Sequence, residues 1–380
     1  MSEPLTSPLH QRHEEAGAKF SEFGGWQMPL EYAGGGVLAE HRAVRDGVGI
    51  FDVSHLGKVL VQGPGALDFL NLCLTNDLHK IGPGQAQYTM LCNEQGGVVD
   101  DMIAYVRAED EVFLIPNAAN AATVVSILER EALRDRTGSE QEAALGGLVI
   151  TDQHRDHAVL AVQGPRSEEV LTELSLPTAM DYMAFDVVER DGWSMTICRT
   201  GYTGEKGWEL VVPVDHALEM WDQVMAAGQR FQIRPCGLGA RDTLRTEMGY
   251  SLHGNDITPQ INPVEAGLSW AVGWKKTEPF LGSDALREVK AAGPSRRMRG
   301  LLALGRGIPR HGMAVVDEAG EVIGEVTSGT FAPTLKQGVG LALVDVRFGL
   351  DDEVGVRVRN RVEKFRIVKP PFVTPEVREG

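Results

Sequence analysis

Residues 88–106 read YTMLCNEQGGVVDDMIAYV, two apolar runs on either side of the turn-like segment Asn93–Gly97. This pattern predicts a β-hairpin whose second strand carries an acidic pair. Because successive side chains of a strand point to opposite faces, Asp101 shares a face with Tyr105, whereas Asp100 lies on the other face. At least one carboxylate must therefore face an apolar environment, where it needs a strong partner, a shifted pKa or a ligand. The alternative is a sheet with one solvated face, on which one Asp is an ordinary acid at a loop end.

The length and charge of the chain bound its organisation and its partners. We expect 380 residues to form two or three domains. A formal net charge of −16 and a pI near 5.1 argue against nucleic acid or an anionic membrane as the main partner. Residues 295–380 carry 14 Lys and Arg against 11 Asp and Glu, a net charge of +3, which leaves −19 for residues 1–294. The C-terminal segment is therefore predicted to be a separate domain.

Cysteine and histidine usage predicts a protein of the reducing cytoplasm without a metal. Neither a zinc site nor a disulfide framework is indicated, because no CxxC pair occurs among Cys73, Cys92, Cys198 and Cys236. The histidines form no HExxH motif. Residues 1–20 lack the apolar centre of a signal peptide, and no apolar run reaches the roughly 18 residues of a membrane span.

A strand-turn-helix pattern occurs twice. VLVQGPGALDFL (59–70) resembles VLAVQGPRSEEVL (159–171), with Gln-Gly-Pro between an apolar run and a helical pattern. Each Pro stands near the first helical position, where a missing N–H costs little. The two copies predict two related α+β units, and the polar stretch 135–147 is the predicted linker. Without the Lys and Gly spacing of a P-loop, these turns are interpreted as structural rather than phosphate-binding.

The segment Leu238–Met248 is predicted to be a helix that carries Arg241 on an apolar face. A guanidinium there must meet an acid or an anionic ligand, so either a ligand contact or an internal ion pair with a core acid is expected. Beyond Arg299, short alternating strands separated by Gly, Pro and acidic turns predict a small all-β barrel or sandwich.

Several stretches, in this order, resemble the aminomethyltransferase (T-protein) family of the glycine cleavage system. They are FGGWQMPLEY (23–32), GIFDVSHLGKVLV (49–61), NEQGGVVDDMIAY (93–105), LIPNAAN (114–120), RTGYTGEKGWEL (199–210), GLGARDTLRTEMGYSLHGNDI (237–257), NPVEAGLSW (262–270) and GEVTSGTFAPTLKQGVGLALV (324–344). The resemblance implies a three-domain α+β cloverleaf with a folate channel in its centre. We expect a discontinuous folate-binding α+β domain (1–52 plus 148–275), a second antiparallel-sheet α+β domain with the acidic hairpin (53–147) and a C-terminal β-barrel (295–380).

The resemblance also implies an activity. Members of the family convert an aminomethyl group on a lipoyl carrier protein into ammonia and 5,10-methylenetetrahydrofolate, and release the dihydrolipoyl arm. The implied partners are therefore the lipoyl carrier protein and the co-substrate tetrahydrofolate, with no metal, nucleic acid or membrane. Family members are commonly served by acidic carriers, so five arginines of the last domain form a candidate docking patch: Arg296, Arg297, Arg299, Arg306 and Arg310. A solvated basic face without a partner is the alternative.

The family's functional residues fall on definite positions of this chain. The catalytic aspartate corresponds to Asp101, which would either take the proton from N10 of tetrahydrofolate or mainly orient that atom. The pterin-binding glutamate corresponds to Glu209, whose carboxylate can accept from a two-donor pterin edge. Other implied folate contacts are Tyr88, Asn117, Tyr202, Arg241 and, near the C-terminus, Arg378. Each tyrosine could instead be core and Glu209 an ordinary strand residue, while for Asn117 a role as a helix N-cap only is an equal alternative.

Two related kinds of protein compete with this interpretation. One is a tetrahydrofolate-dependent S- or O-demethylase of the same fold. The other is a non-catalytic folate-binding protein of iron–sulfur cluster maturation, which carries a Cys in the motif equivalent to RTGYTGEKG. This chain has Gly201 and Tyr202 there and Cys198 before it, which counts against that alternative.

Overall fold

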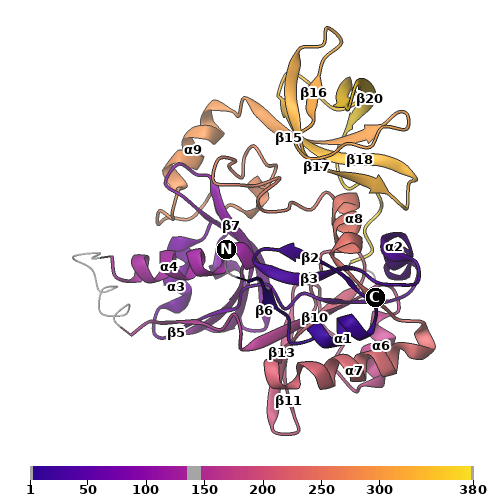
Figure 1. The fold of residues 1–380 in the computed structure, drawn as a ribbon. Helices are drawn as coiled ribbons and strands as arrows, with labels where there is room; N and C mark the ends of the chain where they lie inside the picture. Colours follow the sequence, from indigo (N-terminus) through magenta and orange to yellow (C-terminus); the bar gives the residue numbers. More distant parts are fainter. Residues whose placement is uncertain (1–2, 135–146, 378–380) are drawn as a thin grey trace.

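The structure is a computed structural model that describes residues 3–134 and 147–377 (Figure 1). The linker predicted at 135–147 lies outside the described residues, except for Gly147.

The predicted hairpin forms two strands of a five-stranded sheet. The sheet has the order β6-β7-β8-β5-β9, with β6 Gln85–Cys92, β7 Val98–Ala108, β8 Glu111–Ile115, β5 Val59–Gln62 and β9 Val149–Asp152. Its outer face is covered by α3 (Ala66–Cys73) and α4 (Ala121–Ala132), which pack through residues such as Phe69 and Leu128. The short 3₁₀ helices η1 (Leu78–Lys80) and η2 (Ala118–Asn120) connect these elements.

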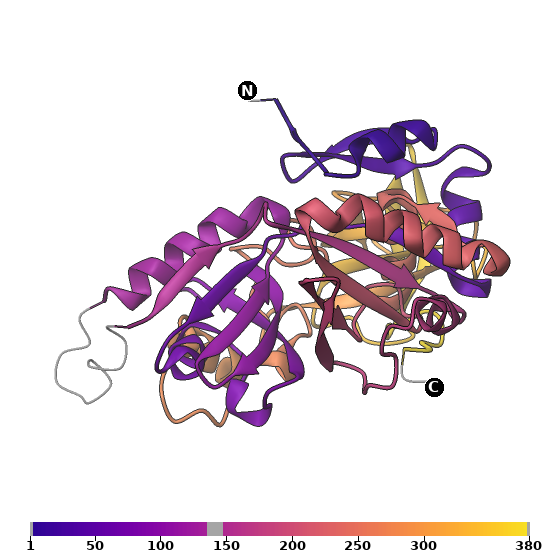
Figure 2. The ribbon, with the colours of Figure 1, turned by 90° about the horizontal axis from the view of Figure 1, so that it is seen from below.

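A six-stranded sheet has the order β11-β12-β13-β10-β4-β14. Its strands are β11 Phe185–Arg190, β12 Trp193–Cys198, β13 Gly207–Pro213, β10 His157–Gln163, β4 Gly49–Asp52 and β14 Arg234–Cys236. The helices α6 (Ser167–Glu173) and α7 (Ala217–Gly228), with η3 (Val214–His216) and η4 (Gln229–Phe231), belong to this unit. The sheet is antiparallel apart from its edge strand β14, which pairs with β4 in parallel. Figure 2 shows α4 and α7 each running along its own sheet.

The inner faces of the two sheets share one apolar cluster, which contains Phe51, Tyr105, Phe113, Val159 and Val211. The two sheets are thus sandwiched between their own helices, and the side chains of β7 that face inward are those of the Asp101 register. This arrangement decides which carboxylate of the acidic pair can reach the interior between the sheets.

The two Gln-Gly-Pro turns have the same geometry. Gly63 (φ +118°) and Gly164 (φ +125°) both adopt a backbone conformation that side chains rarely tolerate. A Cβ at Gly63 would lie 2.3 Å from the carbonyl oxygen of Gly147, and one at Gly164 would lie 2.4 Å from that of Gly47. The turns are therefore close backbone crossings, in line with the structural interpretation of the repeat.

The N-terminal segment and α8 lie beside the six-stranded sheet. A three-stranded sheet has the order β1-β3-β2, with β1 Leu5–Thr6, β3 Trp26–Glu31 and β2 Lys19–Phe23, and is accompanied by α1 (His10–Glu15) and α2 (Gly36–Asp46). The buried Glu40 of α2 accepts from the backbone N–H of Gly237 at 2.9 Å, at the start of α8 (Leu238–Met248). A carboxylate at a helix N-terminus satisfies its free donors, which fixes α8 in place.

The C-terminal segment forms a closed barrel, which confirms the predicted all-β domain. Its order is β15-β18-β17-β16-β19-β20, with β15 Arg296–Ala303, β16 Ala314–Val316, β17 Val322–Ala332, β18 Gln337–Asp345, β19 Glu353–Val358 and β20 Arg361–Val368. The connection to it contains η5 (Ser269–Ala271) and α9 (Ser283–Ala292). The barrel sits above both sheets, with α8 beneath it (Figure 1).

We propose the three domains predicted from the sequence, with β9 counted in the second because it pairs with β5. In the described ranges, no helix is long and apolar enough to cross a membrane. Nor do three or more His, Cys, Asp or Glu side chains of residues 3–134 and 147–377 gather where they could hold a metal ion.

Candidate active site

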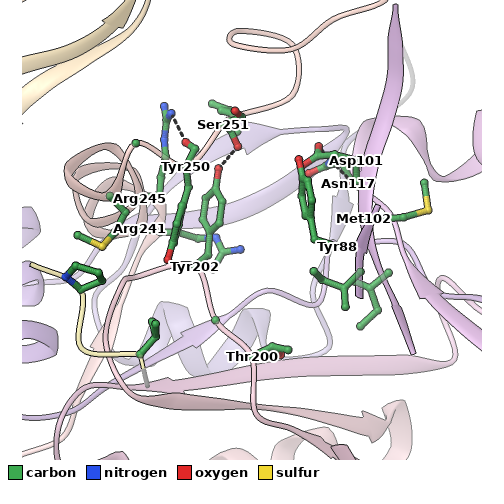
Figure 3. Close-up of a pocket in the computed structure, with 18 of the residues that line it drawn as sticks. Tyr88, Asp101, Met102, Asn117, Thr200, Tyr202, Arg241, Arg245, Tyr250 and Ser251 are labelled. Carbon is green, nitrogen blue, oxygen red and sulfur yellow. Dashed lines mark hydrogen bonds between the residues drawn. The ribbon is translucent and has the colours of Figure 1, made fainter. Parts of the chain in front are cut away.

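A cavity of about 2560 Å³ lies where the two sheets meet α8 and the barrel. Pockets for single drug-sized ligands have volumes of roughly 300–1000 Å³, so this one has room for a large ligand together with a second group. Six side chains predicted from the sequence line it: Tyr88, Asp101, Asn117, Tyr202, Glu209 and Arg241. Figure 3 labels all of these except Glu209. The seventh, Arg378, lies outside the described residues.

The acidic pair divides between the two faces of β7 as the alternation predicted. Asp101 lines the cavity, whereas Asp100 is fully buried on the opposite face. The Asp101 carboxylate accepts from the Tyr88 hydroxyl at 2.9 Å and from Asn117 Nδ2 at 2.9 Å. A carboxylate held from two sides keeps one orientation toward the cavity.

Asp100 supports this arrangement from behind the sheet. It accepts hydrogen bonds from the backbone N–H of Asn117 at 3.0 Å, from Asn117 Nδ2 at 2.9 Å and from Asn120 Nδ2 at 2.7 Å. Burial and the neighbouring Asp101 raise the pKa of Asp100 to about 8. Asn117 does occupy the N-cap position of η2, but its side chain makes no capping bond and instead joins the two aspartates. Asp100 is therefore a positioning residue rather than an ordinary acid at a loop end.

Burial also raises the pKa of Asp101, against the opposing effects of Tyr88, His253 and Asn117. Burial holds the pKa of Tyr88 well above its ordinary value, so its hydroxyl keeps its proton and acts as a donor. A carboxylate with a raised pKa accepts a proton more readily near neutral pH than an exposed one does.

Aromatic side chains form a rim next to Asp101. Trp270 stacks on Tyr88 with ring centroids 5.4 Å apart, yet remains 65% exposed. Phe23 also lines the cavity and is 40% exposed. Its neighbour Gly24 (φ +58°) approaches the segment after Asn117 so closely that a Cβ would lie 2.9 Å from Ala118 Cβ. This end of the cavity thus presents an apolar edge to solvent.

The other end of the cavity is built around Glu209 and Arg241. Glu209, on β13, is buried and accepts from the Thr200 hydroxyl at 2.5 Å. The Arg241 guanidinium lies over the Tyr202 ring, 4.6 Å from its centroid. Its Nη1 is buried without a hydrogen-bond partner, and burial lowers the pKa of Arg241. Buried donors without partners are rare, so this unused donor indicates a site for a ligand.

The internal ion pair weighed for Arg241 is found instead one helical turn later. Arg245 donates to Asp256 at 3.0 Å and to the Ser328 hydroxyl of β17 at 3.0 Å. Asp256 in turn accepts from the Thr327 hydroxyl at 2.5 Å. This cluster joins α8 to the barrel, and within the described residues Arg241 forms no such ion pair, so it stays available to the cavity.

The five arginines considered as a docking patch do not share one surface role. Arg297, Arg299 and Arg310 line the cavity, whereas Arg296 pairs with Glu265 at 2.8 Å and Arg306 is exposed on the barrel.

Sequence analysis did not identify several residues of the candidate site. It assigned no role to Thr200 or Asn120, because a hydroxyl or an amide becomes informative only when its hydrogen-bond partner is known. Trp270 stood in a recognised motif without an assigned role, and Arg245 shares the predicted helix face with Arg241. Their importance follows from contacts between segments far apart in the chain.

The fold and the site together indicate an enzyme with a fixed, partly buried carboxylate beside a large ligand cavity. Two family models match the chain: "GCVT N-terminal domain" over residues 9–276 and "Glycine cleavage T-protein C-terminal barrel domain" over residues 296–374. The chain belongs to the aminomethyltransferase family, the T-proteins of the glycine cleavage system, and is an enzyme with that activity.

Individual relatives agree over the full length. The chain is 54% identical to an aminomethyltransferase of Parafrankia sp. (strain EAN1pec), with 100% of both chains covered. It is 53% identical to one of Mycobacterium tuberculosis (strain ATCC 25618 / H37Rv), with 99% of both covered. The crystal structure of the glycine cleavage system aminomethyltransferase T from Bartonella henselae superimposes with a TM-score of 0.89 at 36% identity, covering 98% of each chain. These matches confirm the predicted family and fold class.

Proposed function

We propose that this enzyme transfers the methylene of an aminomethyl group, delivered on the lipoyl arm of a carrier protein, to tetrahydrofolate. The products are ammonia, 5,10-methylenetetrahydrofolate and the dihydrolipoyl carrier. The observation that supports this most directly is the Asp101 carboxylate, held by Tyr88 and Asn117 and presented to a cavity large enough for both reactants.

The residues at the Glu209 end fit a folate. The pterin ring has a two-donor edge, its 2-amino group and N3–H, which a buried carboxylate such as Glu209 can accept. The unpartnered Nη1 of Arg241 supplies a donor for an acceptor atom of the ligand, and the ring of Tyr202 offers a flat apolar surface. We assign Glu209, Arg241 and Tyr202 to folate binding, and the family's Arg378 remains a candidate for the same role.

Tetrahydrofolate supplies the amines that accept the one-carbon unit. Asp101 takes the proton that N10 loses as it bonds to the incoming carbon, and the raised pKa of this carboxyl suits it to that task near neutral pH. Tyr88 and Asn117 hold the carboxylate in place, so part of the rate comes from fixed geometry.

The carrier's lipoyl arm fits the other end of the cavity. Trp270 and Phe23 form an exposed apolar edge beside Asp101, which suits an aliphatic acyl chain ending in sulfur. We therefore assign the Asp101 end to the arm and the Glu209 end to the folate. We also propose a cytoplasmic location, since the four cysteines are buried and include no CxxC pair.

The test is to supply a carrier loaded with the aminomethyl-lipoyl group and to measure ammonia and methylenetetrahydrofolate with and without tetrahydrofolate. We expect both products in equal amounts and in a folate-dependent manner. A carrier loaded with a methylthio or methoxy substrate is the control for demethylase activity. Turnover of that substrate alone, or folate binding without any turnover, would contradict the proposal.

A further inference from the structure

His55 is a buried residue of the cavity lining that has no role in the site described above. Among the described residues, buried polar atoms without a hydrogen-bond partner occur on four lining residues: His55, Gln87, Arg241 and Arg299. Gln87 alternates with Tyr88 along β6, so its side chain lies on the strand face opposite to the hydroxyl that holds Asp101. His55 is 2% exposed, so a polar group that reaches its ring is shielded from water.

His55 lies between the two ends of the cavity. Phe23, which forms part of the apolar edge, meets the His55 ring at right angles, with ring centroids 5.5 Å apart. Two residues later, the backbone N–H of Gly57 donates to the carbonyl oxygen of Pro116 at 2.8 Å, in the segment beside the acidic pair. On the other side, the charge of Arg241 is near enough to oppose protonation of the ring. The ring therefore borders both the place assigned to the lipoyl arm and the place assigned to the folate.

Buried groups fix the loop that carries His55. Lys58 is fully buried, and its Nζ donates to the carbonyl oxygens of Ser54 at 2.8 Å and Leu56 at 2.7 Å, on either side of His55. His154 Nε2 donates to the carbonyl oxygen of His55 itself at 2.8 Å. These bonds all go to the backbone, and within the described residues the Nδ1 atom of the ring is buried without a partner. A fixed ring with unused hydrogen-bonding capacity suits a ligand.

The imidazole of His55 is uncharged at neutral pH. Burial and the nearby Arg241 lower its pKa to about 3. An uncharged imidazole has one N–H donor and one acceptor nitrogen, so it can accept from an N–H group without bringing a charge into the cavity. A ligand group that carries N–H hydrogens therefore suits this ring.

The proposed reaction releases an amine nitrogen that needs a place in the cavity. The transferred carbon loses its bonds to that nitrogen and to the lipoyl sulfur, and it gains bonds to N5 and N10 of the folate. The two protons that N5 and N10 lose equal the two that the nitrogen and the sulfur gain, so no further reactant is needed. Glu209 and Arg241 are assigned to the folate and Asp101 to N10, which leaves the amine without an assigned partner.

We propose that the imidazole of His55 accepts a hydrogen bond from the amine of the aminomethyl group and holds that nitrogen until it leaves as ammonia. This inference rests on the proposed function. It also gives His55 a part in specificity. A substrate whose reacting carbon carries no N–H group would leave the imidazole unpartnered in a buried site, which disfavours its binding.

The test uses the reverse reaction, in which ammonia, methylenetetrahydrofolate and the dihydrolipoyl carrier form the aminomethyl carrier. For His55→Phe, which keeps a ring but has no ring nitrogen, we expect the KM for ammonia to rise about 10-fold or more, because the amine loses its buried acceptor. The KM for the carrier and the calorimetric dissociation constant of tetrahydrofolate should stay within about 2-fold of the wild type. His55→Gln, whose side chain can still accept a hydrogen bond, should restore part of the affinity for ammonia.

The matched control is His157→Phe. His157, the first residue of β10, also has a buried Nδ1 without a partner among the described residues, but it is not part of the cavity lining. This variant should keep the wild-type KM for ammonia. Tetrahydrofolate binding shows that a variant is folded, and His55→Leu takes the place of His55→Phe if the latter does not fold.

Three outcomes would contradict the inference or its basis. An unchanged KM for ammonia in the folded His55 variant, or the same rise in the His157 control, would overturn the role of His55. Weaker folate binding with an unchanged KM for ammonia would assign His55 to the folate instead. Failure of the wild type to form the aminomethyl carrier would refute the proposed function itself.

Discussion

The two ends of the cavity use their charged groups in different ways. At one end, Asp101 receives hydrogen bonds from Tyr88 and Asn117, and its neighbour Asp100 fixes Asn117 from behind. At the other end, the described residues give the Glu209 carboxylate one hydrogen bond, from Thr200, and leave Arg241 Nη1 without a partner.

The difference separates a group that reacts from groups that bind. Hydrogen bonds that are already made in the protein fix the position and the pKa of a carboxylate, which a proton acceptor needs. Unused hydrogen-bonding capacity in a buried site is filled when a ligand arrives, which is what recognition needs. Changes at the Asp101 end should therefore affect turnover, and changes at the Glu209 end should affect affinity.

The largest effect is expected for Asp101→Asn. This change keeps the shape of the side chain but removes the proton acceptor, so turnover should fall by about 10²–10⁴-fold while folate affinity stays close to that of the wild type. The measurement is ammonia release at saturating folate and carrier, together with calorimetric folate binding.

The neighbouring Asp100→Asn variant is the matched control for Asp101→Asn. Its amide would face the N–H donors of Asn117 and Asn120, so it should mainly lower the free energy of unfolding, by about 1–3 kcal/mol. A larger loss of turnover in Asp100→Asn than in Asp101→Asn, measured on folded protein, would reverse the roles assigned to the two acids.

A smaller effect, on binding, is expected for Glu209→Gln. Losing a charged acceptor for the pterin edge should weaken folate binding by about 10- to 100-fold, as for hydrogen bonds to charged groups. Turnover at saturating folate should fall much less than in Asp101→Asn. Titration calorimetry and the thermal midpoint of unfolding check this. Unchanged folate affinity with lost turnover would assign the chemistry to the Glu209 end of the cavity instead of the Asp101 end.

The smallest effect is expected for Tyr88→Phe, as a shift in pH dependence. The Tyr88 hydroxyl lowers the pKa of Asp101, in opposition to burial, so removing it should raise that pKa further. A base works only when ionised, and its rate is lost as the pH falls through its pKa, so the loss should begin at a higher pH in the variant. The profile of kcat/KM against pH measures this, and an acid limb that stays in place or moves to lower pH would show that Asp101 is not the titrating group.

The sequence alone determined much of the fold and the identity of the six described candidate residues. Alternation in 98–106 was enough to place Asp100 and Asp101 on opposite faces, because the period of a strand is local. The repeated Gln-Gly-Pro turns and the C-terminal strands could likewise be predicted, since each depends on residues that are neighbours in the sequence. The motifs that resemble the family gave the activity.

Only the tertiary structure decided which partners the charged groups have. The sequence could not tell that Arg245, rather than Arg241, forms the ion pair with Asp256, or that Asn117 binds the two aspartates instead of capping η2. It also could not separate Arg297 and Arg299 from Arg296, which stand together in the chain but meet different surroundings. Hydrogen bonds and ion pairs are made over a few ångströms between segments far apart in sequence, so they exist only once the sheets, α8 and the barrel have packed together.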